Sequence, residues 1–94
     1  MNDKKKIEDT NWLLSGKYRV RILEILSTAP STPSEIAEKI NISRASMSRI
    51  LKALREKSFI DCTSSSAKNR LYFITDAGKK IFVHVHTFTK QEGG

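Results

Sequence analysis

The feature that most constrains the fold is a pair of helix start signals that follow one another closely. Thr32 can cap a helix, Pro33 suits its first position, and Glu35 completes a capping box. A second cap, Ser43, comes soon afterwards, and Asn41 between them tolerates the left-handed backbone that a tight turn requires. The sequence therefore predicts two short helices joined by a tight turn, which is the layout of a helix-turn-helix.

Apolar spacing supports this pair of helices. In the second helix, one apolar stripe is expected to be buried because its members lie at i, i+3, i+4 and i+7: Met47, Ile50, Leu51 and Leu54. The first helix presents Ile36, Ala37 and Ile40 to it. The opposite face of the second helix carries small and charged residues: Ala45, Ser48, Arg49, Lys52 and Glu56, with Arg44 and Ser46 in the first turn.

Charge is concentrated on that second helix. The whole chain has a formal charge of +7 and a pI near 9.8, which points to a polyanionic partner such as nucleic acid. Residues 43–58 hold five basic residues and one acid, a net +4, whereas residues 30–42 have a net charge of −1. More than half of the excess therefore lies in one predicted helix.

The rest of the chain is expected to form one domain. We expect a flexible arm over residues 1–11, the domain over 12–90 and a frayed end over 91–94. Another helix, ahead of this pair in the chain, is predicted from Trp12 or Gly16 to Leu26.

After the second helix of the pair, the pattern changes to strands. Residues 59–63 and 70–75 read as a β-hairpin with a polar tip, although residues 71–74 are apolar on both faces and do not show which side faces the core. A last helix, capped by Thr75 or Asp76, carries an apolar stripe: Ile81, Phe82, Val85 and Phe88. The predicted fold is mainly α with a small β-hairpin (α+β).

The run from Ser34 to Leu54 resembles the winged helix-turn-helix of prokaryotic regulators of the MarR and ArsR kind. Residues 55–60 and 72–78 resemble the junctions of that fold with its wing, so the resemblance covers about residues 17–85. The compact size and terminal helix are similar to small archaeal regulators. Two positions depart from the family pattern, since Asn41 and Ser58 stand where glycine is usual.

The resemblance implies a three-helix core with a wing and a C-terminal helix, and a regulator of transcription that binds specific sequences of double-stranded DNA. The helix over about 43–57 would enter the major groove. The implied contact residues on it are Ser43, Arg44, Ala45, Ser46, Ser48, Arg49 and Lys52. Arg44 and Arg49 are the expected base readers, and Lys52 is expected on a phosphate.

Further contacts are expected outside this helix. The free amides at the start of the preceding helix, near Thr32 and Ser34, can hold a phosphate. The wing, about 64–70, would lie on the adjacent minor groove or backbone through Lys68, Asn69 and Arg70. Arg55 and Lys57 are expected to be solvated surface groups. For Lys17, Arg19 and Arg21 the sequence does not decide between a solvated position and contact with the DNA backbone.

Three other classes of function fit the sequence less well. The leading alternative is a winged-helix module that binds proteins and not DNA, although such a module has no need of a +4 helix. An enzyme is not expected, because the chain has neither a glycine-rich phosphate loop nor a nucleophile elbow. Single-strand or RNA binding lacks the exposed aromatic pairs that stack bases.

No cofactor or metal is expected either. His84 and His86 point in different directions on a helix, so they cannot share one metal as a pair, and with Cys62 as the only cysteine no cysteine-based zinc cluster can be built. Metal sensing across a dimer is the weaker alternative that stays open. We expect Cys62 to be a small buried apolar residue. No effector pocket is legible in the sequence.

A homodimer is expected, because the helices supply more apolar surface than one small core needs. The expected interface residues are Trp12, Leu13, Val20, Phe82, Val85 and Phe88. Such a dimer would read two half-sites about one helical turn apart. With no secretion signal or membrane span in the sequence, the expected location is the cytoplasm, on the nucleoid.

Overall fold

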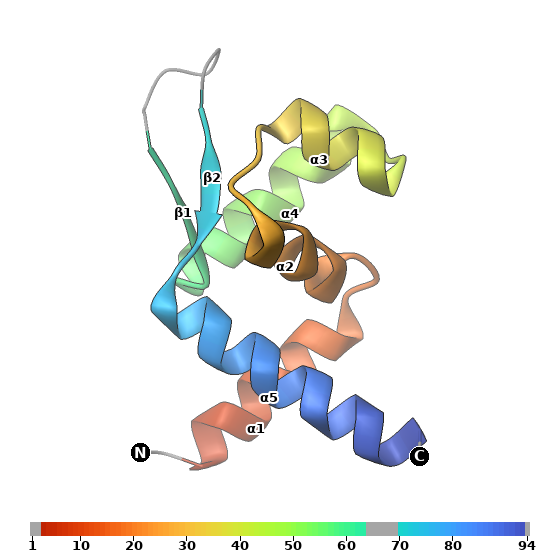
Figure 1. The fold of residues 1–94 in the computed structure, drawn as a ribbon, viewed down its shortest axis with the longest axis vertical. Coiled ribbons are helices and arrows are strands. Elements are labelled where there is room, and N and C mark those ends of the chain that lie inside the picture. The colour runs from red at the N-terminus through yellow and green to blue at the C-terminus, as the bar shows by residue number, and fades with distance from the viewer. Residues whose placement is uncertain (1–2, 64–69, 94) are drawn as a thin grey trace.

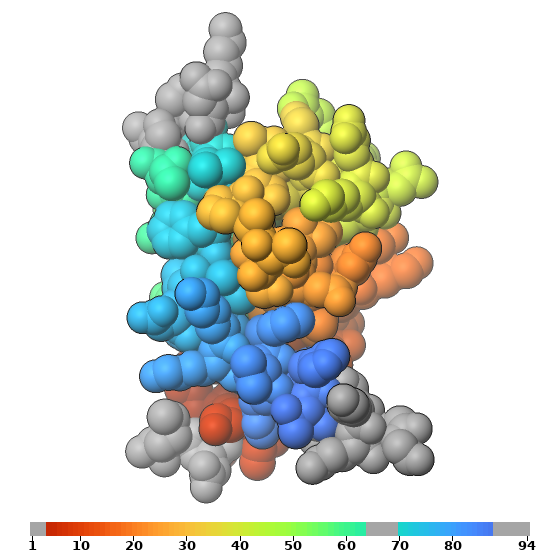
Figure 2. Space-filling view, in the orientation of Figure 1, coloured from red at the N-terminus to blue at the C-terminus, as the bar shows by residue number. Residues whose placement is uncertain are grey.

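A computed structural model describes residues 3–63 and 70–93 of the chain. Within these ranges the elements are α1 (Asp3–Ser15), α2 (Arg19–Thr28), α3 (Pro33–Ile40), α4 (Arg44–Glu56), β1 (Ile60–Cys62), β2 (Tyr72–Ile74) and α5 (Asp76–Gly93). Figure 1 shows α3, α4 and the hairpin at one end of the molecule, and α1 crossing α5 at the other. On the face seen in Figure 2, α2 fills the space between α3 and α5. The predicted fold class is confirmed.

The first segment differs from the expected flexible arm. Residues 3–15 form α1, which packs against α5 and α2 and buries Asp9, Thr10 and Leu13 (7%, 5% and 0% exposed). The carboxylate of Asp9 is tolerated there because Lys5 Nζ lies 3.3 Å away and Lys57 Nζ 3.6 Å away. The Thr10 hydroxyl donates to the Lys6 carbonyl at 2.8 Å. Because the buried face of α1 is partly polar, the polar sequence of this segment did not indicate a packed helix.

The single helix expected up to Leu26 is two helices. The chain turns between Ser15 and Arg19, where the Gly16 N–H donates to the Leu13 carbonyl at 3.4 Å. Arg19 closes this corner, because its guanidinium lies 4.0 Å from the centre of the Trp12 ring and donates to the Trp12 carbonyl.

The helix-turn-helix forms as predicted. The Glu35 N–H donates to Thr32 Oγ1 at 3.2 Å, and the Thr32 N–H donates to Glu35 Oε1 at 2.8 Å, so the capping box is complete. Asn41 ends α3 in the left-handed region at φ 65°. Ser43 caps α4 by accepting the Ser46 N–H at 3.2 Å. Local sequence signals are sufficient to specify both helix starts and the turn.

The end of α4 is a Schellman motif built on serine. The Phe59 N–H donates to the Leu54 carbonyl at 3.1 Å and the Ser58 N–H to the Arg55 carbonyl at 2.8 Å. Ser58 itself has φ 67°, the left-handed conformation in which glycine is usual. The helix therefore ends where a glycine would have ended it, at a cost in backbone strain.

The hairpin pairs Ile60 with Ile74 and Cys62 with Tyr72 in antiparallel register. A third segment joins its edge: the Ser31 N–H donates to the Tyr72 carbonyl at 3.0 Å, and the Tyr72 N–H donates to the Ser31 carbonyl at 2.9 Å. Tyr72 and Ile74 face the core, which settles the orientation that alternation left open. Cys62, expected to be buried, is only half-buried.

Thr75 caps α5, since its hydroxyl accepts the Gly78 N–H at 3.0 Å and donates to the Ser58 carbonyl at 2.6 Å. This second bond ties the start of α5 to the end of α4. In the described parts of the chain, none of the helices is long and apolar enough to cross a membrane.

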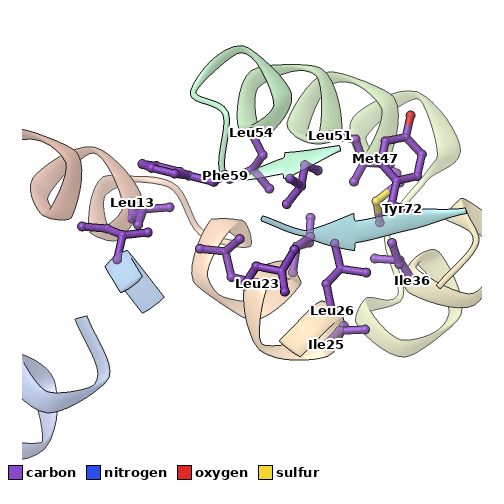
Figure 3. Close-up of a cluster of buried hydrophobic side chains, with 14 of the residues drawn as sticks. Leu13, Leu23, Ile25, Leu26, Ile36, Met47, Leu51, Leu54, Phe59 and Tyr72 are labelled. Carbon is purple, nitrogen blue, oxygen red and sulfur yellow. The ribbon is translucent and has the colours of Figure 1, made fainter. Parts of the chain in front are cut away.

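One core runs the length of the domain. Figure 3 shows it extending from Leu13 and Phe59 at one end to Ile36, Met47 and Tyr72 at the other. Leu13 and Val85, 0% and 1% exposed, belong to this core. The expected dimer interface is therefore corrected at these two residues, because each packs inside its own chain.

Candidate nucleic-acid interface

The outward face of α4 is the most accessible basic surface of the helix-turn-helix. Met47, Leu51 and Leu54 are buried and Ile50 is half-buried, so they fix the inner side of the helix. The predicted contact residues lie largely on the exposed side: Ser43, Arg44, Ala45, Ser48, Arg49 and Lys52. Ser46 is half-buried, and its hydroxyl accepts a hydrogen bond from the Ser43 hydroxyl at 3.1 Å.

The positive charge of α4 is unevenly compensated. Arg55 lies 3.5 Å from Asp61 Oδ1, and Lys57 lies 3.6 Å from Asp9 Oδ1, so the two expected solvated groups face carboxylates of the same chain. Across residues 3–63 and 70–93, Arg44, Arg49 and Lys52 have no such ion pair. The available charge is therefore concentrated in the first three turns of α4.

Arg44 is held across the helix-turn-helix. Its Nη2 donates to Ser34 Oγ at 2.8 Å, which joins the first turn of α4 to the first turn of α3. Ser34 is exposed, whereas the Thr32 side chain is engaged in its capping box. The two helix starts thus form one continuous edge.

A cleft of about 510 Å³ separates α4 from β2. Its lining is mainly basic and polar: Ser48, Lys52, Arg55, Glu56, Arg70 and Tyr72. Arg70 Nη1 donates to Tyr72 Oη at 3.3 Å, and this hydrogen bond raises the pKa of Arg70, which stays charged. Sequence reasoning missed Tyr72, because a run apolar on both faces does not show that the buried Tyr72 side chain lines this cleft.

Two of the predicted wing contacts, Lys68 and Asn69, lie outside the described residues. Two of the basic residues whose role the sequence left undecided are engaged within the chain. Arg19 packs on Trp12, and Arg21 lies beside Glu24. His86 stacks on Phe82 with ring centres 6.1 Å apart, and the described residues contain no cluster of three or more groups suited to a metal ion.

The expected dimer residues differ in how far they are exposed. Val20 and Phe82 are half-buried. The ring of Trp12 is covered by Arg19 at 4.0 Å and Lys57 at 5.0 Å. The Phe88 side chain lies outside the described residues.

This arrangement defines a winged helix-turn-helix protein. Oxidised MarR from E. coli has the same fold, with a TM-score of 0.75 and 22% identity over 96% of this chain and 69% of that one. The MarR family transcription regulator SP03579 gives a TM-score of 0.71 at 24% identity, covering 78% of this chain. Lactococcus lactis ZitR in complex with DNA gives 0.65 at 27% identity, covering 77%. The chain spans about half the length of SP03579 and of ZitR.

A comparison with protein-family models identifies a smaller group of proteins than the fold does. The sequence matches the HVO_A0261 N-terminal domain family over residues 7–92, and the chain belongs to that family. A comparison with curated proteins gives no match.

Proposed function

We propose that this protein regulates transcription by binding specific sequences of double-stranded DNA, with α4 in the major groove. The observation that carries the proposal is the outward face of α4, which presents Arg44, Arg49 and Lys52 without a carboxylate partner in the described chain. A polyanion matches that surface, whereas a neutral partner would leave three cations desolvated and uncompensated. The similarity to ZitR, whose complex with DNA is known, supports the same conclusion.

The residues of α4 have distinct proposed roles. Arg49 is the primary base reader, because it is exposed and arginine can donate two hydrogen bonds to guanine. Arg44 reaches a base only by leaving Ser34, so its contact is conditional on that exchange. Ser48 is exposed for a base or phosphate, while Ser46 serves the helix cap first.

Phosphate contacts are proposed on both sides of α4. The start of α3 offers the Ser34 N–H to one strand, because Pro33 has no N–H and the Thr32 and Glu35 amides are engaged in the capping box. The cleft beside β2 offers Lys52 and Arg70 to the other, with the wing over about 64–70 lying on the adjacent minor groove or backbone. These contacts position the protein and carry no sequence information by themselves.

A matched pair of variants tests the proposal. Arg49→Ala should reduce the preference for a selected duplex over random DNA by about 1–3 kcal/mol. Lys52→Ala should weaken binding to both duplexes alike and lower the salt slope by about one. Binding measured by fluorescence anisotropy from low to moderate salt gives both quantities, after selection of bound sequences from a random pool.

The outcomes separate DNA binding from the alternative. Equal effects of the two variants on selected and random DNA would show that the reading face is wrong. A folded protein that fails to bind duplex DNA at low salt would favour the protein-interaction module instead.

We also propose a homodimer that uses the flank of α5 carrying Phe82, together with Val20 of α2. Both side chains are half-buried and apolar, so pairing two copies there would complete their burial. Light scattering should give twice the monomer mass, and Phe82→Glu should restore the monomer. A monomer at working concentration in the unchanged protein would refute this part. A regulator of this kind would act in the cytoplasm, on the nucleoid.

A further inference from the structure

A second groove lies at the other end of the molecule from α3. Its volume is about 1010 Å³, and it is lined by α1, α5 and the segment that follows α4. Phe59 and Ile81, both buried, form part of its floor, and Val83 stands at its open side with 61% of its surface exposed. It therefore combines an apolar wall with free access from solvent.

The rim of this groove is strongly basic. Its lining includes five lysines: Lys5, Lys6, Lys57, Lys79 and Lys80. Asp9 is the one carboxylate in the lining, and it is already engaged by Lys5 and Lys57. Lys6, Lys79 and Lys80 have no ion pair with any residue in the described ranges. An apolar wall edged by uncompensated cations is complementary to an amphipathic anion.

We propose that this groove binds an acidic amphipathic helix of another protein. The α5 lining runs from Ala77 to Thr87, which is about 15 Å of helix and matches about three turns of a docked helix. In such a helix-in-groove contact, apolar residues at i, i+3, i+4 and i+7 would cover Val83 and the floor. Glutamates beside that stripe would reach Lys79 and Lys80 on one side and Lys6 on the other.

Charge argues against a second copy of this chain as the occupant. A twofold contact places the same patch on both sides, so five lysines would face five lysines. The described helices of this chain do not offer an acidic amphipathic face either, since α1 mixes both signs and α3 carries two glutamates and one lysine.

The shape argues against a small apolar ligand. Sites for such ligands enclose most of the ligand surface, whereas Val83 is left 61% exposed at the groove. A helix that covers one face suits an open groove better.

The proposed partner site does not depend on DNA binding. The groove lining contains Lys57 and Ser58, beyond the end of α4, but none of the exposed residues of the first three turns of that helix. Figure 1 shows α1 and α5 at the end of the fold away from α3. A partner in the groove would therefore leave the proposed reading face open.

The test uses the whole chain and a synthetic peptide of four turns, with leucines on one face and glutamates on the other. Fluorescence anisotropy of the labelled peptide should show saturable binding that weakens with salt. Lys79→Glu with Lys80→Glu should weaken it about tenfold, since two ion pairs are lost and two repulsions gained. Val83→Asp should weaken it by a similar factor, and because Val83 is exposed the fold should survive.

Three controls make the result decisive. A scrambled peptide of the same composition should bind at least about tenfold more weakly, because its apolar residues no longer share a face. Arg49→Ala with Lys52→Ala should bind the peptide as the unchanged protein does, and amide shifts on titration should map to residues 5–9 and 77–87. Equal binding of the scrambled peptide, unchanged binding by both groove variants, or shifts confined to α4 would each overturn the proposal. So would self-association that Val83→Asp abolishes, since that would place a second copy in the groove.

Discussion

Gly78 offers a sharp test of how α5 is seated on the hairpin. A Cβ added there would lie 2.1 Å from the Phe59 carbonyl oxygen and 2.7 Å from Ile74 Cγ1, whereas ordinary contact begins near 3.4 Å. The Phe59 oxygen cannot give way freely, because it accepts the Thr75 N–H at 3.0 Å. The helix start or the strand must therefore shift by about an ångström in Gly78→Ala.

The sign of this change depends on two opposing terms. Overpacking of this kind costs about 1–3 kcal/mol, and contact with backbone places Gly78→Ala at the upper end. Alanine is favoured over glycine inside a helix by up to about 1 kcal/mol, which is the smaller term. The net loss should be about 2 kcal/mol, or roughly 8–16 °C in the melting temperature of a domain this size.

Thermal and urea unfolding followed by circular dichroism measure this loss. Gly16→Ala is the matched control, because the three atoms nearest to its Cβ would all belong to the flexible side chain of Arg19. That side chain can swing away, so the control should lose only the contacts of Arg19 with the Trp12 ring and carbonyl, and less stability than Gly78→Ala loses. A Gly78→Ala protein as stable as the unchanged one would refute the close approach of α5 to Phe59.

Two further changes test the ends of the recognition unit. Ser58→Gly should stabilise the protein by about 0.5–1 kcal/mol, since it relieves the left-handed backbone at φ 67°; an unchanged urea midpoint would contradict that strain. The Thr32 backbone and side-chain hydrogen bonds lower the pKa of Glu35, so its stabilisation is complete above the ordinary glutamate pKa of about 4.3 and is lost as pH falls through the lowered folded value. Glu35→Gln should therefore flatten the pH dependence of the urea midpoint below about pH 5, and parallel curves for the two proteins would count against the capping box.

The sequence predicted the helix-turn-helix well because its signals are local. Thr32, Glu35, Asn41 and Ser43 act on backbone groups within a few residues of themselves. The first helix could not be recognised in this way. Asp9 is tolerated inside the fold because Lys57 reaches it from the end of α4 as well as Lys5 from its own helix, and nothing near Asp9 in the sequence indicates the Lys57 partner.

In the candidate site, too, the local features could be predicted from the sequence and the contacts between distant elements could not. The exposed face of α4 follows from helical spacing, and most of its members lie where that spacing places them. The structure differs from the sequence-based expectation in how much positive charge is left unpaired on and just after α4. Asp61 and Asp9, from other elements, engage Arg55 and Lys57. The Arg44–Ser34 bond and the position of Tyr72 likewise depend on packing between elements.

The bridge between Ser31 and Tyr72 has a consequence for how DNA would be recognised. Its two backbone hydrogen bonds fasten the loop before α3 to the inner strand of the hairpin, so the helix-turn-helix and the base of the wing move as one body. If both meet DNA as proposed, the protein cannot adjust the spacing between them. The duplex must therefore deform to match the protein, and sequences whose grooves deform easily would be favoured at positions that no side chain touches.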